Sequence, residues 1–136
     1  MTLNEQIVID GKDSVLGRVA SYAAKQALLG KKIVILNCND LLLTGRRNMI
    51  LEQYSHMRSR GRGAQKGPII PKVAEKIMKR TIRGMLEYTQ KRGEAALDRI
   101  ICYNATPKEF ESAKKISLAR ELKIRTLKLG EIARII

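Results

Sequence analysis

The sequence predicts an α/β fold built on a mainly parallel β-sheet, and three features indicate it. A β-rich run at residues 7–11 is followed by an apolar stripe at helical spacing and then by a continuous apolar run at residues 33–36. Continuous apolar runs are typical of strands that are buried on both faces of a parallel sheet. A strand, a helix and a strand within about 30 residues form a βαβ crossover. Because the chain has 136 residues, we expect a single domain over residues 1–136.

The first helix is predicted to begin at residue 15. Apolar residues recur there at helical spacing, namely at Leu16, Val19, Ala20, Ala23, Ala24, Ala27 and Leu28. Asp13 or Ser14 is the expected N-cap, because their side chains can accept a hydrogen bond from a free backbone amide. Gly30 is the expected residue just past the end of the helix, where a left-handed backbone is common.

The middle of the chain predicts a short strand, a helix and then a basic arm. Residues 41–43 are three leucines, and Thr44 would cap a helix over residues 46–57. Residues 58–68 carry four positive charges, three glycines and no acid. A segment without an apolar period cannot bury a face of its own. We therefore expect an extended, basic, glycine-rich arm over about residues 58–71.

A second well-marked helix is predicted over residues 72–86. At about 100° per residue, five cations fall within one arc of about 100°: Lys72, Lys76, Lys79, Arg80 and Arg83. The opposite side carries Val73, Ala74, Ile77, Met78, Thr81 and Met85. We expect the apolar side to pack on the sheet and the basic stripe to face outward. Gly84 costs helix stability, about 1 kcal/mol against Ala, and is expected to mark a close packing contact.

The last third of the sequence carries weaker signals of secondary structure. Residues 93–97 begin another helical stretch, and residues 100–103 form a further strand. Pro107 interrupts regular structure. We expect an irregular C-terminal extension over about residues 107–136, with a helix around residues 108–121 and an extended tail.

The charge distribution points to a polyanionic partner. The net charge is +14 and the sequence pI is about 10.2. Residues 46–92 hold thirteen Lys or Arg and three Asp or Glu, a net charge of +10. Clustered cations with a pI above about 9 are typical of nucleic-acid-binding proteins. With four Tyr, one Phe and no Trp, base stacking is disfavoured, and contact with the backbone and shape of folded RNA is favoured.

Catalytic and metal-binding patterns are not found, so we expect no enzyme activity and no metal site. His56 is the only histidine; beside the basic arm it is expected to face phosphate or to pack. Cys38 and Cys102 are too few and too far apart for a zinc site or a disulfide framework. Both follow or end apolar runs and are expected to be small buried residues in a reducing compartment.

The sequence also lacks a complete phosphate-binding loop motif, so we expect no cofactor. Residues 61–67 have one residue too many for the dinucleotide fingerprint, and Lys12 is not followed directly by the Ser or Thr of a P-loop. Asp10, Asp13 and Asp40 could lie near strand ends, where α/β enzymes place their sites. Turn formation and helix capping explain these three residues more simply.

No membrane partner is expected either. No apolar run approaches the roughly 18 residues that a membrane span needs. The first six residues lack the basic and apolar regions of a signal peptide. We expect a cytoplasmic protein.

Several motifs in one order resemble those of the large-subunit ribosomal protein L13 family. They are Leu-Gly-Arg-Val-Ala-Ser at 16–21, Leu-Gly-Lys-Lys-Ile-Val-Ile-Leu-Asn at 29–37, Lys-Gly-Pro at 66–68, Arg-Thr-Ile-Arg-Gly-Met-Leu at 80–86, Arg-Gly at 92–93 with Ala-Leu at 96–97, Asn-Ala-Thr-Pro at 104–107 and Leu-Gly-Glu-Ile at 129–132. The short length and the basic arm resemble the archaeal and eukaryotic branch. The chain departs from the family in having Ile69, Ile70 and Pro71 after the Gly-Pro, and Lys79 where an aromatic residue commonly precedes the Arg-Thr.

The resemblance implies a three-layer α/β/α fold with a small, mainly parallel, four-stranded sheet. It also implies a structural protein of the large ribosomal subunit that binds large-subunit rRNA, supports subunit assembly and translation, and lies beside other ribosomal proteins. It implies no catalysis, no cofactor and no small-molecule substrate.

The charge pattern predicts which residues would contact rRNA. The helix stripe would clamp phosphates, and the arm would thread between rRNA helices and become ordered on binding. The expected rRNA-binding residues are Arg46, Arg47, His56, Arg58, Arg60, Arg62, Lys66, Lys72, Lys76, Lys79, Arg80, Arg83, Lys91 and Arg92.

Two other functions remain open from the residues alone. The βαβ start is compatible with a small nucleotide-binding α/β enzyme. The basic face could equally bind duplex DNA.

Overall fold

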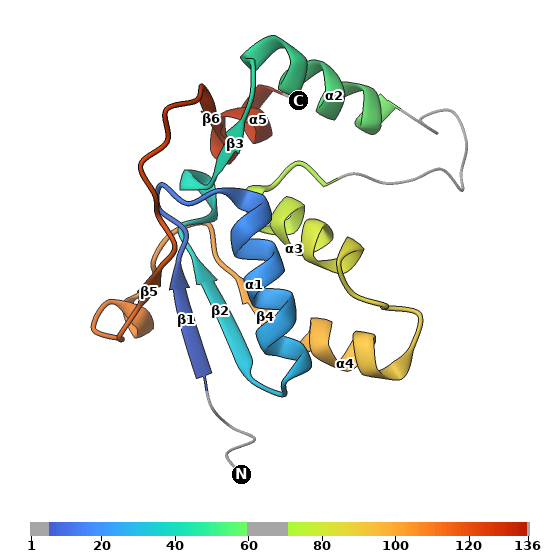
Figure 1. Cartoon of the computed structure of the whole chain (residues 1–136), viewed down its shortest axis with the longest axis vertical. Helices are drawn as coiled ribbons and strands as arrows, with labels where there is room; N and C mark the ends of the chain where they lie inside the picture. The colour runs from blue at the N-terminus through green and yellow to red at the C-terminus, as the bar shows by residue number, and fades with distance from the viewer. Residues whose placement is uncertain (1–5, 60–70, 136) are drawn as a thin grey trace.

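The computed structural model describes residues 6–59 and 71–135 (Figure 1). Within these ranges the chain forms, in order, β1 (Gln6–Asp10), α1 (Leu16–Leu28), β2 (Lys32–Leu36), the 3-10 turn η1 (Cys38–Asp40), β3 (Leu42–Thr44), α2 (Arg47–Ser59), α3 (Ala74–Gly84), α4 (Lys91–Asp98), β4 (Ile100–Cys102), the 3-10 turn η2 (Lys108–Phe110), β5 (Ile116–Ser117), β6 (Thr126–Lys128) and α5 (Leu129–Ile135).

The main sheet has four strands in the order β4-β2-β1-β5, and each neighbouring pair is parallel. Val8 pairs with Val34, and Ile35 pairs with Cys102. The apolar runs at residues 7–9 and 33–36 are buried on both faces, because they lie at the centre of the sheet. The predicted α/β class with a small parallel sheet is confirmed.

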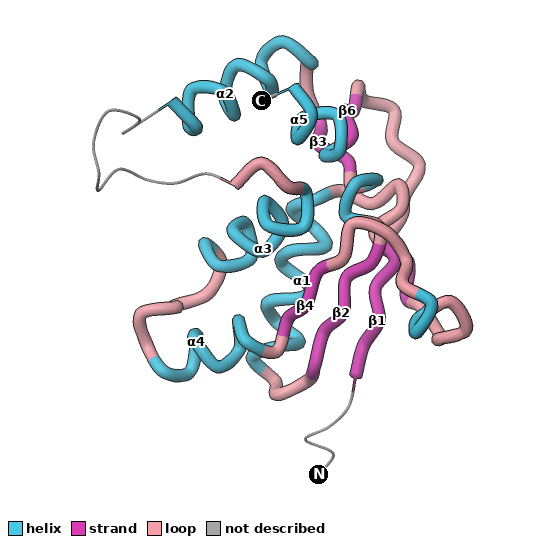
Figure 2. The backbone as a smooth tube through the Cα atoms, turned by 180° about the vertical axis from the view of Figure 1, so that it is seen from behind, coloured by secondary structure: helices cyan, strands magenta, loops and turns pink. Residues whose placement is uncertain are grey.

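The two faces of the sheet are covered differently. Helix α1 lies over one face, and α3 and α4 lie beside α1 and the β4 edge (Figures 1 and 2). On the opposite face Val8, Val34 and Leu36 are covered by a short segment around η2, through Tyr103, Phe110 and Ala113. The layer on this second face is therefore a 3-10 turn with its flanking loops, whereas α1, α3 and α4 gather on the first face.

Helix α1 packs its apolar side against the sheet. Six of its residues are buried: Leu16, Val19, Ala20, Ala23, Ala24 and Ala27. Leu28, which the apolar stripe included, is exposed instead. The predicted cap is wrong, because Val15 occupies the N-cap and no side chain caps the helix. Gly30 has a φ of 95°, as predicted for the residue past the helix end.

A second, two-stranded sheet lies at the end of the molecule that also holds α2 and α5 (Figure 1). It pairs β3 with β6 in antiparallel register, Leu43 facing Leu127. The predicted third strand therefore exists but joins the C-terminal part of the chain. Thr44 ends β3 and does not cap α2, which begins three residues later after Gly45 at a φ of 132°.

Helix α3 buries Ala74, Ile77, Met78 and Ile82. Val73 and Met85, predicted on the apolar side, are exposed. The prediction for Gly84 is wrong: a Cβ built there meets no atom within 4 Å. A close packing contact occurs instead at Gly93 in α4, where an added Cβ would collide with the backbone carbonyl of Glu87.

The C-terminal extension differs most from the prediction. No helix spans residues 108–121; that stretch contains η2 and β5, because Phe110 packs on the sheet and Ile116 pairs with β1. The tail is not extended throughout, since α5 forms at its end. Leu129 and Ile132 are fully buried there, so burial of an apolar face stabilises this short helix.

Among the described residues, no helix is long and apolar enough to span a membrane.

Candidate nucleic-acid interface

Helix α3 presents the predicted basic side away from the core. Lys72, just before the helix, and Lys76 are exposed, whereas Lys79, Arg80 and Arg83 are half-buried. Glu75 is the single acid of the helix, and its backbone amide donates a hydrogen bond to Asn104 Oδ1 at 2.9 Å. The outer side of α3 therefore carries an almost uncompensated positive charge.

These cations converge on a surface hollow of about 230 Å³. We call it the cationic hollow. It is lined by Pro71, Lys76, Lys79, Arg80, Arg83 and Leu97. No acidic residue of the described chain lines it, so its four cations, Lys76, Lys79, Arg80 and Arg83, repel one another. An anionic group bound between them would relieve this repulsion and gain several charge-assisted hydrogen bonds.

Lys79 occupies a special position at the inner wall of the cationic hollow. Its Nζ donates hydrogen bonds to the backbone carbonyl of Leu97, at 2.7 Å, and to that of Ile100. Burial lowers the pKa of Lys79, and this is partly opposed by the negative charges of Cys102 and Asp98. Lys79 was predicted to bind phosphate, but its side chain instead joins α3 to the junction of α4 and β4. It can do so because Lys79 lies at the boundary between the basic and the buried side of the helix.

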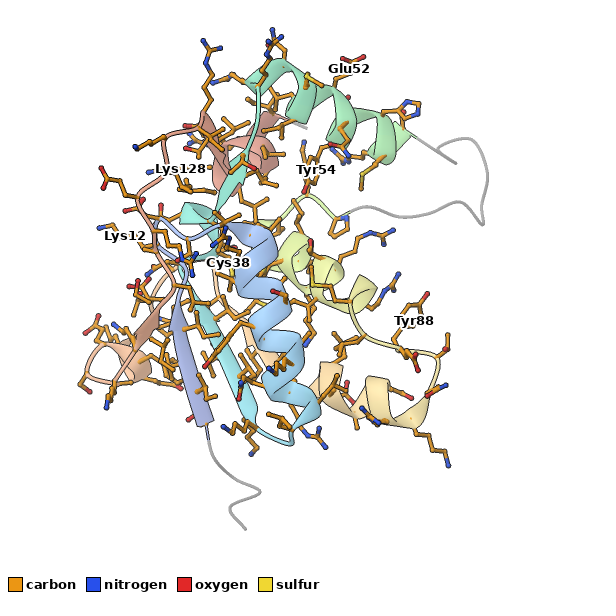
Figure 3. All side chains as sticks on the ribbon, in the orientation of Figure 1. Lys12, Cys38, Glu52, Tyr54, Tyr88 and Lys128 are labelled. Carbon is orange, nitrogen blue, oxygen red and sulfur yellow. The ribbon has the colours of Figure 1, made fainter. Side chains whose placement is uncertain are left out.

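Arg83 is held at the outer end of the hollow by an aromatic ring. Its guanidinium carbon lies 4.7 Å from the centroid of the Tyr88 ring, a cation–π contact. Figure 3 labels Tyr88 on the loop that joins α3 to α4. Tyr88 was not among the predicted residues, because a tyrosine five residues after an arginine is common by chance and does not indicate a contact.

Helix α2 adds a second group of predicted cations. Arg46, Arg47, His56 and Arg58 are all exposed. Arg47 lies 3.8 Å from a carboxylate oxygen of Glu131, and an exposed ion pair of this kind is weak and easily exchanged. Their exposure leaves these side chains accessible to a large partner.

A small hollow of about 200 Å³ lies between α2 and α3. Tyr54 and Met57 of α2 line one side, and Ile77, Thr81 and Gly84 of α3 line the other, with Arg80 reaching this hollow as well. Figure 3 shows Tyr54 pointing from α2 into this space. Burial raises the pKa of Tyr54 above its ordinary value of 10.0. Arg80 therefore connects the basic surface of α3 with the region under α2.

Helix α4 completes the group of basic helices. Lys91 and Arg92 lie in its first turn and are exposed. Helices α2, α3 and α4 all lie on the side of the molecule away from β1 and β5 (Figures 1 and 2). Of the predicted arm, Arg60, Arg62 and Lys66 lie outside the described residues.

A larger hollow, of about 540 Å³, lies near η1 and α5. We call it the mixed-charge hollow. Its charged lining residues are two acids, Asp40 and Glu131, and two bases, Lys128 and Arg134. Lys128 Nζ lies 3.9 Å from an Asp40 carboxylate oxygen. Since the charges balance, this hollow has no preference for an anion despite its size.

Asp10, at the carboxyl end of β1, has a structural role. Asp10 Oδ1 accepts hydrogen bonds from the Lys12 amide, at 3.0 Å, and from Asn37 Nδ2, at 2.9 Å, so its predicted turn role is confirmed. No cluster of three or more His, Cys, Asp or Glu that could hold a metal ion occurs in the part of the chain that the structure describes.

Comparison with known proteins agrees with this basic, non-catalytic surface. The sequence model of Ribosomal protein L13 matches residues 4–109. The chain is similar to a protein of Natronomonas pharaonis named large ribosomal subunit protein uL13, with 39% identity over 129 residues, which cover 93% of this chain and 88% of the relative.

Two further relatives carry the same name. That of Picrophilus torridus is 36% identical over 133 residues, covering 96% of each chain, and that of Methanosarcina barkeri is 37% identical over 132 residues, covering 93% of this chain and 94% of the relative. The family match spans the α1–β2 motifs, the α3 motif and the Asn-Ala-Thr-Pro turn, and the relatives extend it along most of the chain. This protein belongs to the Ribosomal protein L13 family, a family of ribosomal proteins and not of enzymes.

Proposed function

We propose that this chain is a structural component of the large ribosomal subunit that binds large-subunit rRNA through the cationic hollow and the exposed cations of α2 and α4. In this role it supports subunit assembly and lies beside other large-subunit proteins on cytoplasmic ribosomes. Three similar proteins are named large ribosomal subunit proteins, which supports the assignment to the large subunit.

The observation that carries the proposal is the convergence of four cations, without an acid, on the cationic hollow. Lys76, Arg80 and Arg83 are the phosphate-binding residues that we assign there. Lys79 is assigned to holding the wall in place, because its ammonium is committed to backbone carbonyls. Each phosphate that is neutralised releases condensed counterions, and this release provides sequence-independent affinity.

The surface is suited to the backbone of folded RNA more than to bases. Among the described residues of the cationic hollow there is no aromatic side chain on which a base could stack, and Tyr88 is already covered by Arg83. Phosphate contacts position a protein on RNA without reading its sequence. We therefore assign specificity to the shape of the folded rRNA that fits α2, α3 and α4 together.

Salt dependence of binding tests the proposal. The affinity of the purified full chain for large-subunit rRNA fragments is measured at increasing salt concentration. The logarithm of the binding constant should fall linearly with the logarithm of salt, with a slope several units negative. The double variant Arg80→Ala/Arg83→Ala should reduce the steepness of that slope by about 1–2 units while the circular dichroism spectrum stays that of the wild type.

The alternatives give different results in the same assay. Binding that does not change between low and high salt would contradict the proposal. Duplex DNA that competes as well as the rRNA fragment would instead identify a DNA-binding protein. If the double variant unfolds, Arg80 and Arg83 are structural residues, and the phosphate contacts must be assigned to other cations.

A further inference from the structure

The only two cysteines of the chain, far apart in the sequence, meet at one end of the parallel sheet. Cys102 ends β4, where it pairs with Ile35 of β2. Cys38 begins η1 directly after β2, and its backbone amide donates a hydrogen bond to the Tyr103 carbonyl at 3.0 Å. The carboxyl ends of neighbouring parallel strands lie at the same edge, so the chain direction brings both residues together.

The two side chains are neighbours, because the Cys38 amide binds the carbonyl of Tyr103, the residue after Cys102, and each thiol shifts the pKa of the other. The Cys38 sulfur also lies 3.9 Å from the Ile35 carbonyl oxygen, a weaker alternative acceptor. Both cysteines are free thiols in the structure. Formation of a disulfide from this arrangement requires the two sulfurs to approach to about 2 Å with a Cβ–S–S–Cβ dihedral angle of about 90°.

The two thiols differ in their access to solvent. Cys38 is completely buried, whereas Cys102 is half-buried and lines a surface hollow of about 420 Å³. The other lining residues of this hollow are Glu75, Lys76, Lys79, Asp98, Ile100 and Ile101. A small molecule that enters this hollow therefore meets Cys102, whereas Cys38 is buried behind it. Figure 3 labels Cys38 in the interior, near the beginning of α1.

The surroundings also favour ionisation of one thiol over the other. The hydrogen bond with Cys38 lowers the pKa of Cys102, and the Lys79 ammonium adds to this effect, against burial and the Glu75 carboxylate. The same hydrogen bond, together with burial, raises the pKa of Cys38. Reactive cysteines are typically partly exposed thiolates beside a cation, and Cys102 meets this description.

We propose that Cys38 and Cys102 form an intramolecular disulfide when the protein meets a small peroxide, with Cys102 as the attacking thiol and Cys38 as the resolving thiol. The Cys102 thiolate attacks one oxygen of the peroxide, and the O–O bond breaks. Cys102 becomes a sulfenic acid, and the departing hydroxide takes a proton to become water. The Cys38 sulfur then attacks the Cys102 sulfur, the S–O bond breaks, and the second hydroxide leaves as water with the Cys38 proton. Two electrons pass from the thiol pair to one hydrogen peroxide.

The disulfide would constrain the basic part of the protein. The segment between Cys38 and Cys102 contains α2, α3 and α4, so the disulfide would close a loop that carries the cationic hollow. A cross-link of a long loop restricts the unfolded chain. The oxidised protein should therefore melt roughly 5–10 °C above the reduced protein.

The test treats the purified, reduced full chain with an excess of hydrogen peroxide and then alkylates the remaining thiols under denaturing conditions. Mass spectrometry should show the loss of both free thiols, a mass decrease of two hydrogens, and one peptide that joins Cys38 to Cys102. Dithiothreitol should restore both thiols. The cross-link should form equally well in dilute protein, because it is intramolecular.

Two variants assign the roles of the thiols. Cys38→Ala should stop the reaction at a sulfenic acid on Cys102, which dimedone traps, and Cys102→Ala should leave Cys38 unmodified. Circular dichroism of the reduced variants shows whether they are folded. If one of them is unfolded, the peptide map of the oxidised wild type alone decides whether Cys38 and Cys102 become cross-linked. Unchanged thiols, a disulfide between two chains, or sulfinic acid on Cys102 without a cross-link would each overturn the proposal.

Discussion

The cationic hollow and the mixed-charge hollow are both concave and both lined by Lys and Arg, yet they differ in what they can bind. The first is the smaller, about 230 Å³ against about 540 Å³. Its cations converge without an acid, whereas Lys128 and Arg134 of the second lie among Asp40 and Glu131. Size alone would favour the mixed-charge hollow, whereas the balance of charges favours the cationic hollow as the surface for a polyanion.

The comparison also shows that cations on the same helical stripe serve different purposes. Lys76 and Lys79 are three residues apart on the basic side of α3. Lys76 is exposed, but Lys79 reaches the Leu97 and Ile100 carbonyls. A helical projection gives the direction in which a side chain leaves the helix, and it does not show which neighbouring carbonyls lie within reach.

Charge reversal in the two hollows should produce the largest difference. Lys76→Glu places an acid in the cationic hollow, where we expect rRNA affinity at about 0.1 M salt to fall about tenfold to a hundredfold. Lys128→Glu in the mixed-charge hollow should lower the affinity less than about threefold, because Asp40 and Glu131 already cancel the cations there. Filter binding or fluorescence anisotropy with the same rRNA fragment measures both. Equal losses in the two variants would remove the distinction between the hollows.

Replacing the two lysines by Met should separate stability from binding. Lys79→Met leaves the carbonyls of Leu97 and Ile100 without their charged donor, and we expect it to lower the free energy of unfolding by about 2 kcal/mol. Lys76→Met should change that free energy by less than about 0.5 kcal/mol but should reduce the salt slope of rRNA binding by about one unit. Urea unfolding and salt titration give the two quantities.

The reverse pattern would be decisive against this division of roles. If Lys79→Met left the unfolding midpoint unchanged and reduced the salt slope as Lys76→Met does, Lys79 would be a phosphate-binding residue after all.

The smallest expected effect concerns the hollow between α2 and α3, which borders the cationic hollow through Arg80. Burial raises the pKa of Tyr54 in the folded state above 10.0, so the folded protein keeps this proton longer than the unfolded chain. The resulting stability is fully present below pH 10 and is lost as the pH rises through the folded pKa. Because phenylalanine has no proton to lose, the stability of Tyr54→Phe should not fall in this way as the pH rises.

Unfolding free energies of wild type and Tyr54→Phe measured at pH 8 and pH 10.5 check this prediction. The difference between the two proteins should shift by about 0.5 kcal/mol in favour of Tyr54→Phe at the higher pH. A difference that is the same at both pH values would mean that the Tyr54 hydroxyl is solvated and that α3 does not cover it.

Much of the fold followed from local patterns. The two apolar runs and the α1 stripe predicted the βαβ unit correctly, because burial on both faces leaves no polar residue in a central strand. The α3 helix and its basic side were also predicted. The C-terminal extension was not, because its elements depend on distant partners: β6 pairs with β3, β5 pairs with β1, and α5 buries Leu129 and Ile132 against other parts of the chain.

The candidate site was predictable in outline for a similar reason. A cluster of cations without acids is visible in the sequence, and so is the set of motifs that identifies the family. The contacts of Lys79 with the Leu97 and Ile100 carbonyls and of Tyr88 with Arg83 could not be predicted from the sequence. They depend on how α4 and the loop before it pack against α3.

The sequence by itself therefore determined the fold class, the family and the strongly basic character of the central segment, because these depend on residue types and on their order along one strand or helix. Tertiary structure alone decided which cations converge on a hollow, which one is committed to the core, and that Cys38 and Cys102 meet. Each of these is a contact between residues far apart in the chain, and its existence depends on the packing of several elements at once.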